Sequence, residues 1–244
     1  RTGLLKITYQ RKADHPREFL KDFRGVCVTN GYQVYHTLEG ELEDLEISGC
    51  WAHSRRRYDE AVKALPKSEQ KMSLAYLALS QIQQIYHEEG KLQDMTPVER
   101  HKHRQKFIKP LVDAYFNWIR INIDKVMPKS KTYNGMAYSL NQEKYLRRFL
   151  DDGEIPIDNN AAEQSIRSFC IGKKNWVMCD TINGAKSSAI IYSLVETAKA
   201  NNLRLYEYFN YLLTEIPEHM DDKNNDFCEK LLPWSDELPA ECRK

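Results

Sequence analysis

The pattern of apolar and polar positions changes partway along the chain. Short β-rich runs at residues 4–9, 25–29 and 45–50 predict strands, and residues 15–23 carry apolar side chains at helical spacing. Strands that alternate with a helix are typical of α/β folds. From Trp51 onward the spacing becomes helical for about a hundred residues, which marks a second kind of region.

This helical stretch is interpreted as an insertion of several helices with no clear repeat period. Apolar spacing predicts helices at residues 52–65, 69–89, 97–126 and 137–150, the third of them either continuous or broken. Thr96, Pro97 and Glu99 form a well-marked helix start. Thr can cap the helix, Pro is tolerated in the first turn, and a Glu three positions after the Thr completes a capping box.

Beyond the insertion, a break at residues 151–156 leads into further helices. The expected elements are a capped helix start at residues 158–167, a basic loop at 173–176, and helices at 185–200 and 206–213. After Pro217 the chain is polar and acidic, and we expect it to be extended.

Composition adds a protein class to this pattern. With 41% hydrophobic and 29% charged residues among 244, the chain is typical of a soluble globular protein of one or two domains. No apolar run approaches the roughly 20 residues that span a bilayer. The formal net charge of +1 conceals a basic body and an acidic tail, since residues 215–244 hold nine acids and four bases. The basic body permits binding to a polyanion but does not require it.

The six cysteines are scattered, form no Cys-x-x-Cys pair and follow no targeting segment. A reduced, cytoplasmic setting is therefore expected rather than a disulfide framework. The chain begins at Arg1 without an initiator Met, which indicates a fragment or a trimmed chain.

Four groups of residues could carry chemistry, and the first is Asp158-Asn159-Asn160 followed by Glu163. In one interpretation Asp or Asn caps a helix, and Glu163 lies in its first turn near the positive end of the helix dipole. In the other, Glu163 projects from that helix start into a cleft as a metal ligand. The capping interpretation is the commoner one for an arbitrary sequence.

The second group joins Cys50 and His53 to three arginines, Arg55, Arg56 and Arg57. A Cys-x-x-His pair can be half of a zinc site, but no second pair with suitable spacing follows. A packed Cys beside a hydrogen-bonded His is the commoner outcome. The arginines either form a solvated face or clamp phosphate groups.

The third and fourth groups lie at the ends of other elements. Arg167, Lys173 and Lys174 with the aromatic Trp176 suit a nucleic-acid backbone with a stacked base, or an ordinary surface loop around a buried Trp. Asn30 ends a predicted strand, where a plain strand-to-helix turn is the simpler interpretation.

Taken in order, these groups resemble the insertion-sequence 66 family of DDE transposases. The matching stretches are residues 29–35, 49–56, 158–163, 171–176, 192–201 and 231–234. The resemblance covers essentially the whole chain, and residues 158–201 are its most specific part.

The resemblance implies an α/β, RNase H-like core in which three carboxylates bind two divalent metals, normally Mg²⁺. These metals serve phosphodiester cleavage and strand transfer at transposon ends. Carried over, the family's Glu is Glu163 and its second Asp position is Asn30. Both are catalytic and metal-binding positions, and they should face one cleft. The first Asp is expected before Arg1, because residues 4–10 contain no acid.

The same resemblance assigns partners and supporting roles. The expected DNA-binding residues are Arg55, Arg56, Arg57, Arg167, Lys173, Lys174 and Trp176. The residues expected to brace the core or approach DNA, rather than bind zinc, are Cys50, His53, Asp158 and Asn160. The partners are double-stranded DNA at transposon ends and, optionally, a second copy of the chain. The setting is a bacterial cytoplasm, at the nucleoid when DNA is bound, with no membrane.

The resemblance also suggests domain boundaries. Residues 1–58 and 153–216 should form two parts of the RNase H-like core, which is incomplete at its N-terminus. Residues 59–152 should form the large all-helical insertion, and residues 217–244 an acidic extended tail.

Asn30 departs from the family pattern, because a neutral amide offers one carbonyl oxygen without the negative charge that holds Mg²⁺. The chain is therefore expected to be impaired in strand cleavage, with the metal bound weakly or not at all. The alternative is a non-catalytic DNA-binding or assembly remnant of a transposase. An unrelated helical scaffold is a third and remote interpretation.

Overall fold

The computed structural model describes residues 14–176, 181–222 and 224–244. This part of the chain is mostly helical and forms two compact units, which meet in sequence between Asn160 and Ala161. We call residues 14–160 the first unit and residues 161–244 the second unit. The predicted strand at residues 4–9 lies outside the described residues.

The first unit contains a β-α-β element. Strands β1 (Gly25–Thr29) and β2 (Leu45–Gly49) pair in parallel, with Gly25 opposite Leu45 and Thr29 opposite Gly49, and helix α2 (Gln33–Glu41) connects them. Both strands coincide with predicted β-rich runs, whereas α2 was indicated only by the strand-to-helix turn at Asn30, without bounds. Parallel strands need a crossover of this kind, because their carboxyl ends lie at the same edge.

A small core supports the sheet. Leu20 of helix α1 (Asp14–Leu20) is buried with Leu38 of α2 and with Leu45 and Ile47 of β2. These side chains leave water together, and the burial of each contributes roughly 1.5–3 kcal/mol. The predicted helix at residues 15–23 is thus present, in a shorter form that ends at Leu20.

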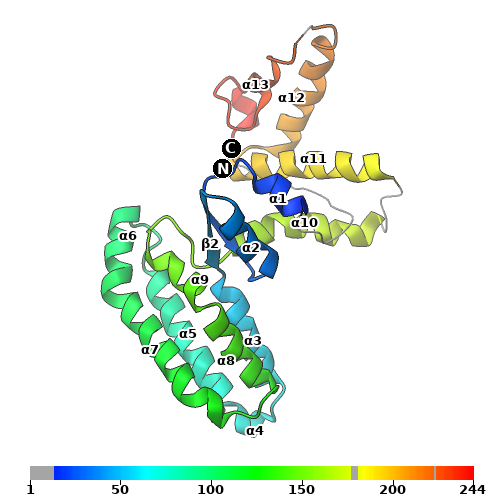
Figure 1. Cartoon of the computed structure of the whole chain (residues 1–244). Helices are drawn as coiled ribbons and strands as arrows, with labels where there is room; N and C mark the ends of the chain where they lie inside the picture. The colour runs from blue at the N-terminus through cyan, green and yellow to red at the C-terminus, as the bar shows by residue number, and fades with distance from the viewer. Residues whose placement is uncertain (1–13, 177–180, 223) are drawn as a thin grey trace. The chain divides into compact units, whose positions relative to one another are not determined.

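The rest of the first unit is a helical bundle (Figure 1). Its α-helices are α3 (Trp51–Lys63), α4 (Lys67–Gln70), α5 (Leu74–Gly90), α6 (Pro97–His103), α7 (Lys109–Asn122), α8 (Lys131–Asn141) and α9 (Glu143–Arg147). Short 3₁₀ segments follow α7 and α9, at Ile123–Lys125 and Arg148–Leu150. The bundle and the two strands lie in the same compact unit.

Local chemistry explains where the bundle helices begin and break. The capping box predicted at Thr96 is confirmed: the Thr96 hydroxyl accepts from the backbone N–H of Glu99, and the Glu99 carboxylate accepts from that of Thr96. The predicted helix at residues 97–126 is broken by a π-helical turn, Arg104–Ile108, just before Pro110. Proline has no backbone N–H to continue the α-helical pattern, which accounts for the interruption there.

The bundle core is built around Trp51, which is fully buried. Its ring lies 5.4 Å from the ring of Tyr115 and 6.1 Å from that of Phe149, and its Nε1 donates a hydrogen bond of 2.7 Å to the carbonyl of Leu146. Because the indole N–H is satisfied, the large apolar ring is buried without leaving a donor unpaired. This core joins α3 to α7 and α9 and fixes the direction in which α3 leaves β2.

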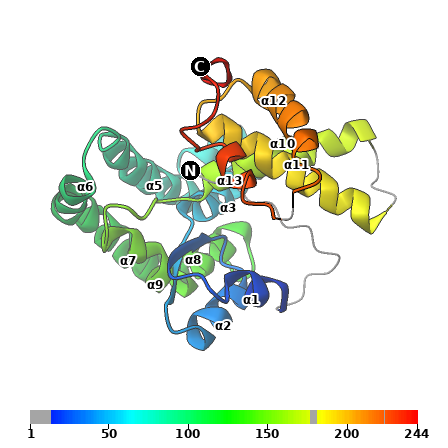
Figure 2. The same cartoon turned by 90° about the horizontal axis from the view of Figure 1, so that it is seen from above.

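The second unit consists of helices α10 (Asn160–Trp176, with Asn160 itself in the first unit), α11 (Ile182–Ala200), α12 (Leu205–Glu218) and α13 (Cys228–Leu231), with a final 3₁₀ turn at Ala240–Cys242 (Figure 2). Its core holds Ala198, Leu203, Tyr208, Leu212 and Leu231. None of the helices in the described part of the chain is long and apolar enough to cross a membrane.

Two predictions for this region are wrong. The expected basic loop at residues 173–176 is the last turn of α10, because the stretch contains no proline and the single Gly172 lowers helix propensity without ending the helix. The tail after Pro217 is folded rather than extended. Leu238 and Cys242 are buried, and Leu203 forms an antiparallel bridge with Arg243, because apolar residues among the acids pack against α12.

Candidate functional site

Asn30 lies directly after β1, in an exposed turn. Its side-chain Oδ1 accepts a hydrogen bond of 3.2 Å from the backbone N–H of Tyr32, and its own carbonyl accepts one of 3.2 Å from the hydroxyl of Tyr138. Gly31 has a φ of +79°, and a Cβ there would come within 2.9 Å of the Tyr138 hydroxyl oxygen. The turn therefore needs glycine for both its backbone conformation and the close approach of α8.

Cys50 occupies the corresponding place after β2, at the start of α3. It is wholly buried, and its N–H donates a hydrogen bond of 3.0 Å to the carbonyl of Thr29. Burial raises the pKa of its thiol, while the nearby backbone N–H groups of Asn159 and His53 oppose the rise. A buried thiol with a raised pKa is a poor nucleophile, so its position favours a packing role.

Asp158 comes to the same edge of the sheet. The N–H of Trp51 donates to the carbonyl of Ile157, which brings this segment beside the start of α3. The Asp158 carboxylate accepts 2.8 Å hydrogen bonds from the Tyr86 hydroxyl and from the side chain of Asn160, and a 3.1 Å bond from the backbone N–H of Asn160. Asp158 thus caps α10, in agreement with the capping interpretation of the motif.

The structure therefore places Asn30, Cys50 and Asp158 together at the carboxyl ends of β1 and β2. The charge of Asp158 contributes to the raised pKa of Cys50, which places those two groups within electrostatic range of each other. Asp158 is distant in sequence from the other two residues, and the folding of the intervening bundle brings it back to the strands.

The predicted arginines lie on one helix of the first unit. Arg55, Arg56 and Arg57 are exposed on α3. The Arg57 guanidinium lies 4.1 Å from the ring centre of Tyr138, which is a cation–π contact. Arg57 is thus exposed and also contacts the tyrosine that binds the turn at Asn30. His53 is half-buried in the first turn of the same helix.

In the second unit, Glu163 lies in the first turn of α10 and is half-buried, and Arg167 follows one turn later with an exposed side chain. Lys173, Lys174 and Trp176 form the end of the same helix. The pairing of Asn30 with Glu163 in one cleft stays a prediction.

The donor atoms in the described residues do not fit an Mg²⁺ site. Asn30 offers a neutral amide whose oxygen already accepts from Tyr32, and Asp158 is engaged by Tyr86 and Asn160. Within residues 14–176, 181–222 and 224–244, no group of three or more His, Cys, Asp or Glu side chains is arranged to hold a metal ion. Mg²⁺ is usually held by one or two carboxylates together with water and substrate phosphates, and neither Asn30 nor Asp158 offers a carboxylate free to bind it, so we derive no step through a metal from them.

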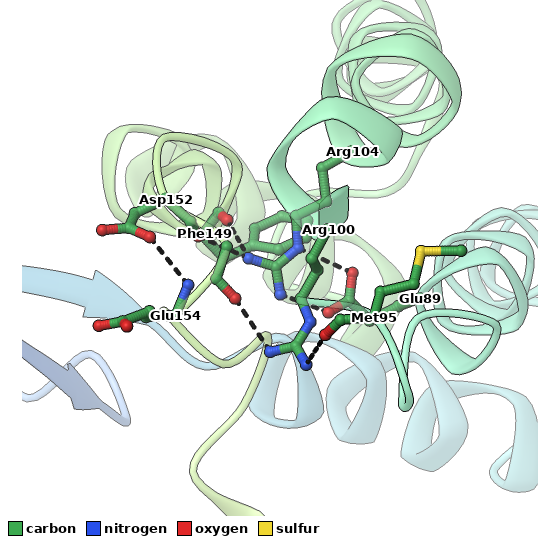
Figure 3. A network of polar contacts seen from close by, with 8 residues as sticks. Glu89, Met95, Arg100, Arg104, Phe149, Asp152 and Glu154 are labelled. Carbon is green, nitrogen blue, oxygen red and sulfur yellow. Dashed lines mark hydrogen bonds and ion pairs between the residues drawn. The ribbon is translucent and has the colours of Figure 1, made fainter. Parts of the chain in front are cut away.

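A buried arginine fixes the segment that precedes Asp158 (Figure 3). Arg104, which is only 1% exposed, forms an ion pair with Glu89 and donates hydrogen bonds of 2.6 and 2.7 Å to the carbonyls of Phe149 and Asp152. One turn earlier, Arg100 donates to the carbonyl of Gly153 at 3.0 Å. The π-helical turn at Arg104 thus holds the chain on its return from the bundle to the strands.

The residues that organise this site could not be predicted from the sequence. Tyr86, Tyr138 and Arg104 lie on helices, where an aromatic or an arginine at helical spacing has many ordinary explanations. The glycine after Asn30 was the one available signal, since Asn-Gly indicates a turn with a left-handed residue. Nothing in the sequence showed that α8 would contact that turn.

Comparison with known proteins identifies the family of this chain. The sequence model of the family described as Transposase IS66 family matches residues 2–187. The chain belongs to the IS66 transposase family. A second model, the IS66 C-terminal element, matches residues 193–234, which include α12 and α13. The family suggested by the motif order is thus confirmed over nearly the whole chain.

The curated relatives of this IS66 chain come from Sinorhizobium fredii. It is 28% identical to the uncharacterized protein y4qI over 232 residues, which cover 92% of this chain and 41% of that protein. It is 26% identical to the uncharacterized protein y4jD, covering 92% of this chain and 44% of that protein. The chain therefore spans about two fifths of the length of these relatives. No solved structure matches it.

Proposed function

We propose that this chain is the catalytic region of a transposase that acts on double-stranded DNA at transposon ends. Asn30 and Glu163 occupy the second and third acidic positions of a DDE site in an RNase H-like core, and the bundle is its helical insertion. The first acid belongs to a preceding strand. With Asn30 in place of Asp, the chain binds DNA but is impaired in strand cleavage.

The observation that carries this proposal is the edge of the sheet at which Asn30, Cys50 and Asp158 lie together. Asn30 follows β1, Cys50 follows β2, and Asp158, which precedes the helix that carries Glu163 in sequence, lies beside Cys50 at that same edge. In open α/β sheets, ligands bind outside the carboxyl ends of the strands. The family match supports DNA as the substrate.

The basic residues support the DNA component of the proposal. Arg55 and Arg56 are exposed on α3, the helix that leaves this edge of the sheet, and Arg167 is exposed on α10. Guanidinium groups bind phosphates in a bidentate manner and remain charged at all physiological pH values. We propose that the exposed guanidinium groups on each of these helices contact phosphates of the transposon end.

A nicking assay on labelled transposon-end DNA tests the proposal. An extended chain that includes the preceding strand with its Asp, and that carries Asn30→Asp, should cut DNA when Mg²⁺ is supplied. The Glu163→Gln variant of that extended chain should bind DNA and fail to cut, because its carboxylate acts mainly in the transition state. Cleavage by this variant at the parental rate would reduce Glu163 to a helix-start carboxylate.

A second candidate function is a DNA-binding or assembly remnant without chemistry, and Asn30 is the observation that favours it. In that case the extended chain with Asn30→Asp would bind transposon ends and leave them intact. The nicking assay therefore separates the two functions, provided that DNA binding is measured on the same samples. Light scattering with and without DNA tests the predicted association of two copies.

A further inference from the structure

Two tyrosine hydroxyls from the helical bundle bind the turns at the carboxyl ends of the strands. Tyr138 of α8 donates to the carbonyl of Asn30 across 108 positions of sequence, at 3.2 Å. Tyr86 of α5 donates to the carboxylate of Asp158 across 72 positions, at 2.8 Å. One hydroxyl thus contacts the turn that holds the second acidic position, and the other contacts the cap of the helix that carries Glu163.

Both hydroxyls are fixed as hydrogen-bond donors. Burial raises the pKa of Tyr138, and the Arg57 guanidinium above its ring only partly opposes this. Burial also raises the pKa of Tyr86, and the negative charge of Asp158 raises it further. A phenol with a raised pKa keeps its proton at every pH at which proteins normally function. Neither contact is therefore switched by titration of the tyrosine.

Cys50 connects the two contacts into one cluster. It lies within electrostatic range of both Tyr86 and Tyr138. The backbone N–H of Asn159, next to Asp158, influences the pKa of its thiol, and its own N–H donates to the carbonyl of Thr29, next to Asn30. The turn after β1 and the start of α10 are thus held on one continuous framework within the first unit.

We propose that Tyr86 and Tyr138 are positioning residues, through which the helical insertion sets the geometry of the strand-end turn at Asn30 and of the start of the Glu163 helix. The inference rests on the proposed function, which assigns Asn30 and Glu163 to the reaction site. The insertion is then a frame for the reaction site, because two of its helices, α5 and α8, each contribute one hydroxyl to a segment that carries or adjoins a site residue. Neither tyrosine touches DNA or takes part in bond breaking.

Removal of the hydroxyl alone tests this inference, since Tyr→Phe keeps the aromatic ring and its packing. Hydrogen exchange of this chain should be measured by mass spectrometry for Tyr138→Phe, Tyr86→Phe and the control Tyr76→Phe. Tyr76 lies on the same helix as Tyr86 and packs against the same core. The control shows what removal of a hydroxyl does when Asn30 and Asp158 keep their contacts.

We expect amides at residues 30–35 to exchange roughly three- to tenfold faster in Tyr138→Phe, the change expected when one hydrogen bond is removed. Amides at residues 158–164 should do the same in Tyr86→Phe, and neither segment should change in Tyr76→Phe. Unchanged exchange in both segments, or an equal increase along the whole chain, would show that the tyrosines only pack.

A second measurement connects the positioning to the reaction. In the extended chain with Asn30→Asp, each of the two Tyr→Phe variants should cut about tenfold more slowly at saturating DNA, with the Kd for DNA unchanged. Equal cleavage rates would overturn the positioning role while the proposed function stands. If the extended chain with both tyrosines does not cut, the proposed function fails, and the exchange experiment still decides whether the hydroxyls fix the two segments.

Discussion

At the scale of single residues, the site depends on close approaches that only particular side chains allow. Gly31 permits α8 to lie against the turn after β1. Arg104 places a positive charge inside the bundle, where Glu89 neutralises the charge and two backbone carbonyls accept its hydrogen bonds. Each residue performs a task that its nearest chemical relative cannot perform in the same place.

The first prediction is that Gly31→Ala destabilises the protein by about 1–2 kcal/mol. Alanine would have to adopt a φ of +79°, and its Cβ would press on the Tyr138 hydroxyl and on the Gln142 side chain. Gly40→Ala is a matched control, because a Cβ there meets nothing within 4 Å. Urea denaturation of both variants measures the difference, and equal stabilities would contradict the close approach.

The second prediction is that Arg104→Met lowers the free energy of unfolding by about 3–5 kcal/mol. The substitution leaves the largely buried Glu89 carboxylate without its partner and the carbonyls of Phe149 and Asp152 without donors. Lys91→Met removes an exposed ion pair with Glu88 and should cost less than about 1 kcal/mol. Thermal unfolding of the two variants compares them, and a similar decrease in both would contradict the role of Arg104.

At the scale of elements, the contact between α2 and α9 joins the β-α-β element to the bundle. The ring of His36 on α2 stacks on that of Tyr145 on α9, with centroids 3.9 Å apart and planes 6° from parallel. Burial lowers the pKa of His36, the charge of Glu39 opposes this, and the charge of Lys144 adds to it. The folded protein therefore favours the neutral imidazole at this junction.

The third prediction follows from the sign of that shift. The pKa of His36 is lower in the folded state than its ordinary value of about 6.5, so the unfolded chain takes up the proton first. Stability from this residue is complete above about pH 6.5 and decreases as the pH falls toward the folded-state pKa. His36→Phe keeps an aromatic ring beside Tyr145 and should lose this part of the pH dependence. Urea denaturation at several pH values between 7.5 and 5 tests it, and identical pH profiles would contradict the assignment.

At the scale of the whole molecule, charge is distributed unevenly along the sequence. Residues 215–244 hold nine acids and four bases, so the rest of the chain carries the excess of positive charge. The acidic segment is folded against α12 through Leu231 and Leu238. The bases proposed to contact DNA are outside it, on α3 and α10.

The fourth prediction concerns DNA binding by the whole chain. Replacing Lys173 and Lys174 by Ala should weaken binding to all sequences and reduce the salt slope of log K by about one for each phosphate that is no longer neutralised. Replacing Lys67 and Lys71 by Ala makes the same charge change on and beside α4 and is the control. Fluorescence anisotropy at several salt concentrations measures both slopes. An equal effect of the two double variants would indicate a non-specific response to net charge.

Elements whose signals are local could be predicted from the amino-acid sequence. The strands at residues 25–29 and 45–50, the capping box at Thr96 and a helix start near residue 160 were all correctly predicted. Each depends on residues within a few positions of one another, and period-2 or capping chemistry acts at that range. The order along the chain of the four residue groups that begin at Asn30, Cys50, Asp158 and Arg167 was also enough to indicate the family.

Tertiary packing determines which other parts of the chain these local elements contact. The tail at residues 217–244 folds because Leu231 and Leu238 find an apolar surface on α12, and the helical turn at residues 173–176 continues an α-helix that begins at Asn160. The contacts of Tyr138 with Asn30 and of Tyr86 with Asp158 join residues 108 and 72 positions apart. Such pairs depend on how the helices pack, and side-chain packing is a property of the folded chain rather than of any short stretch of sequence.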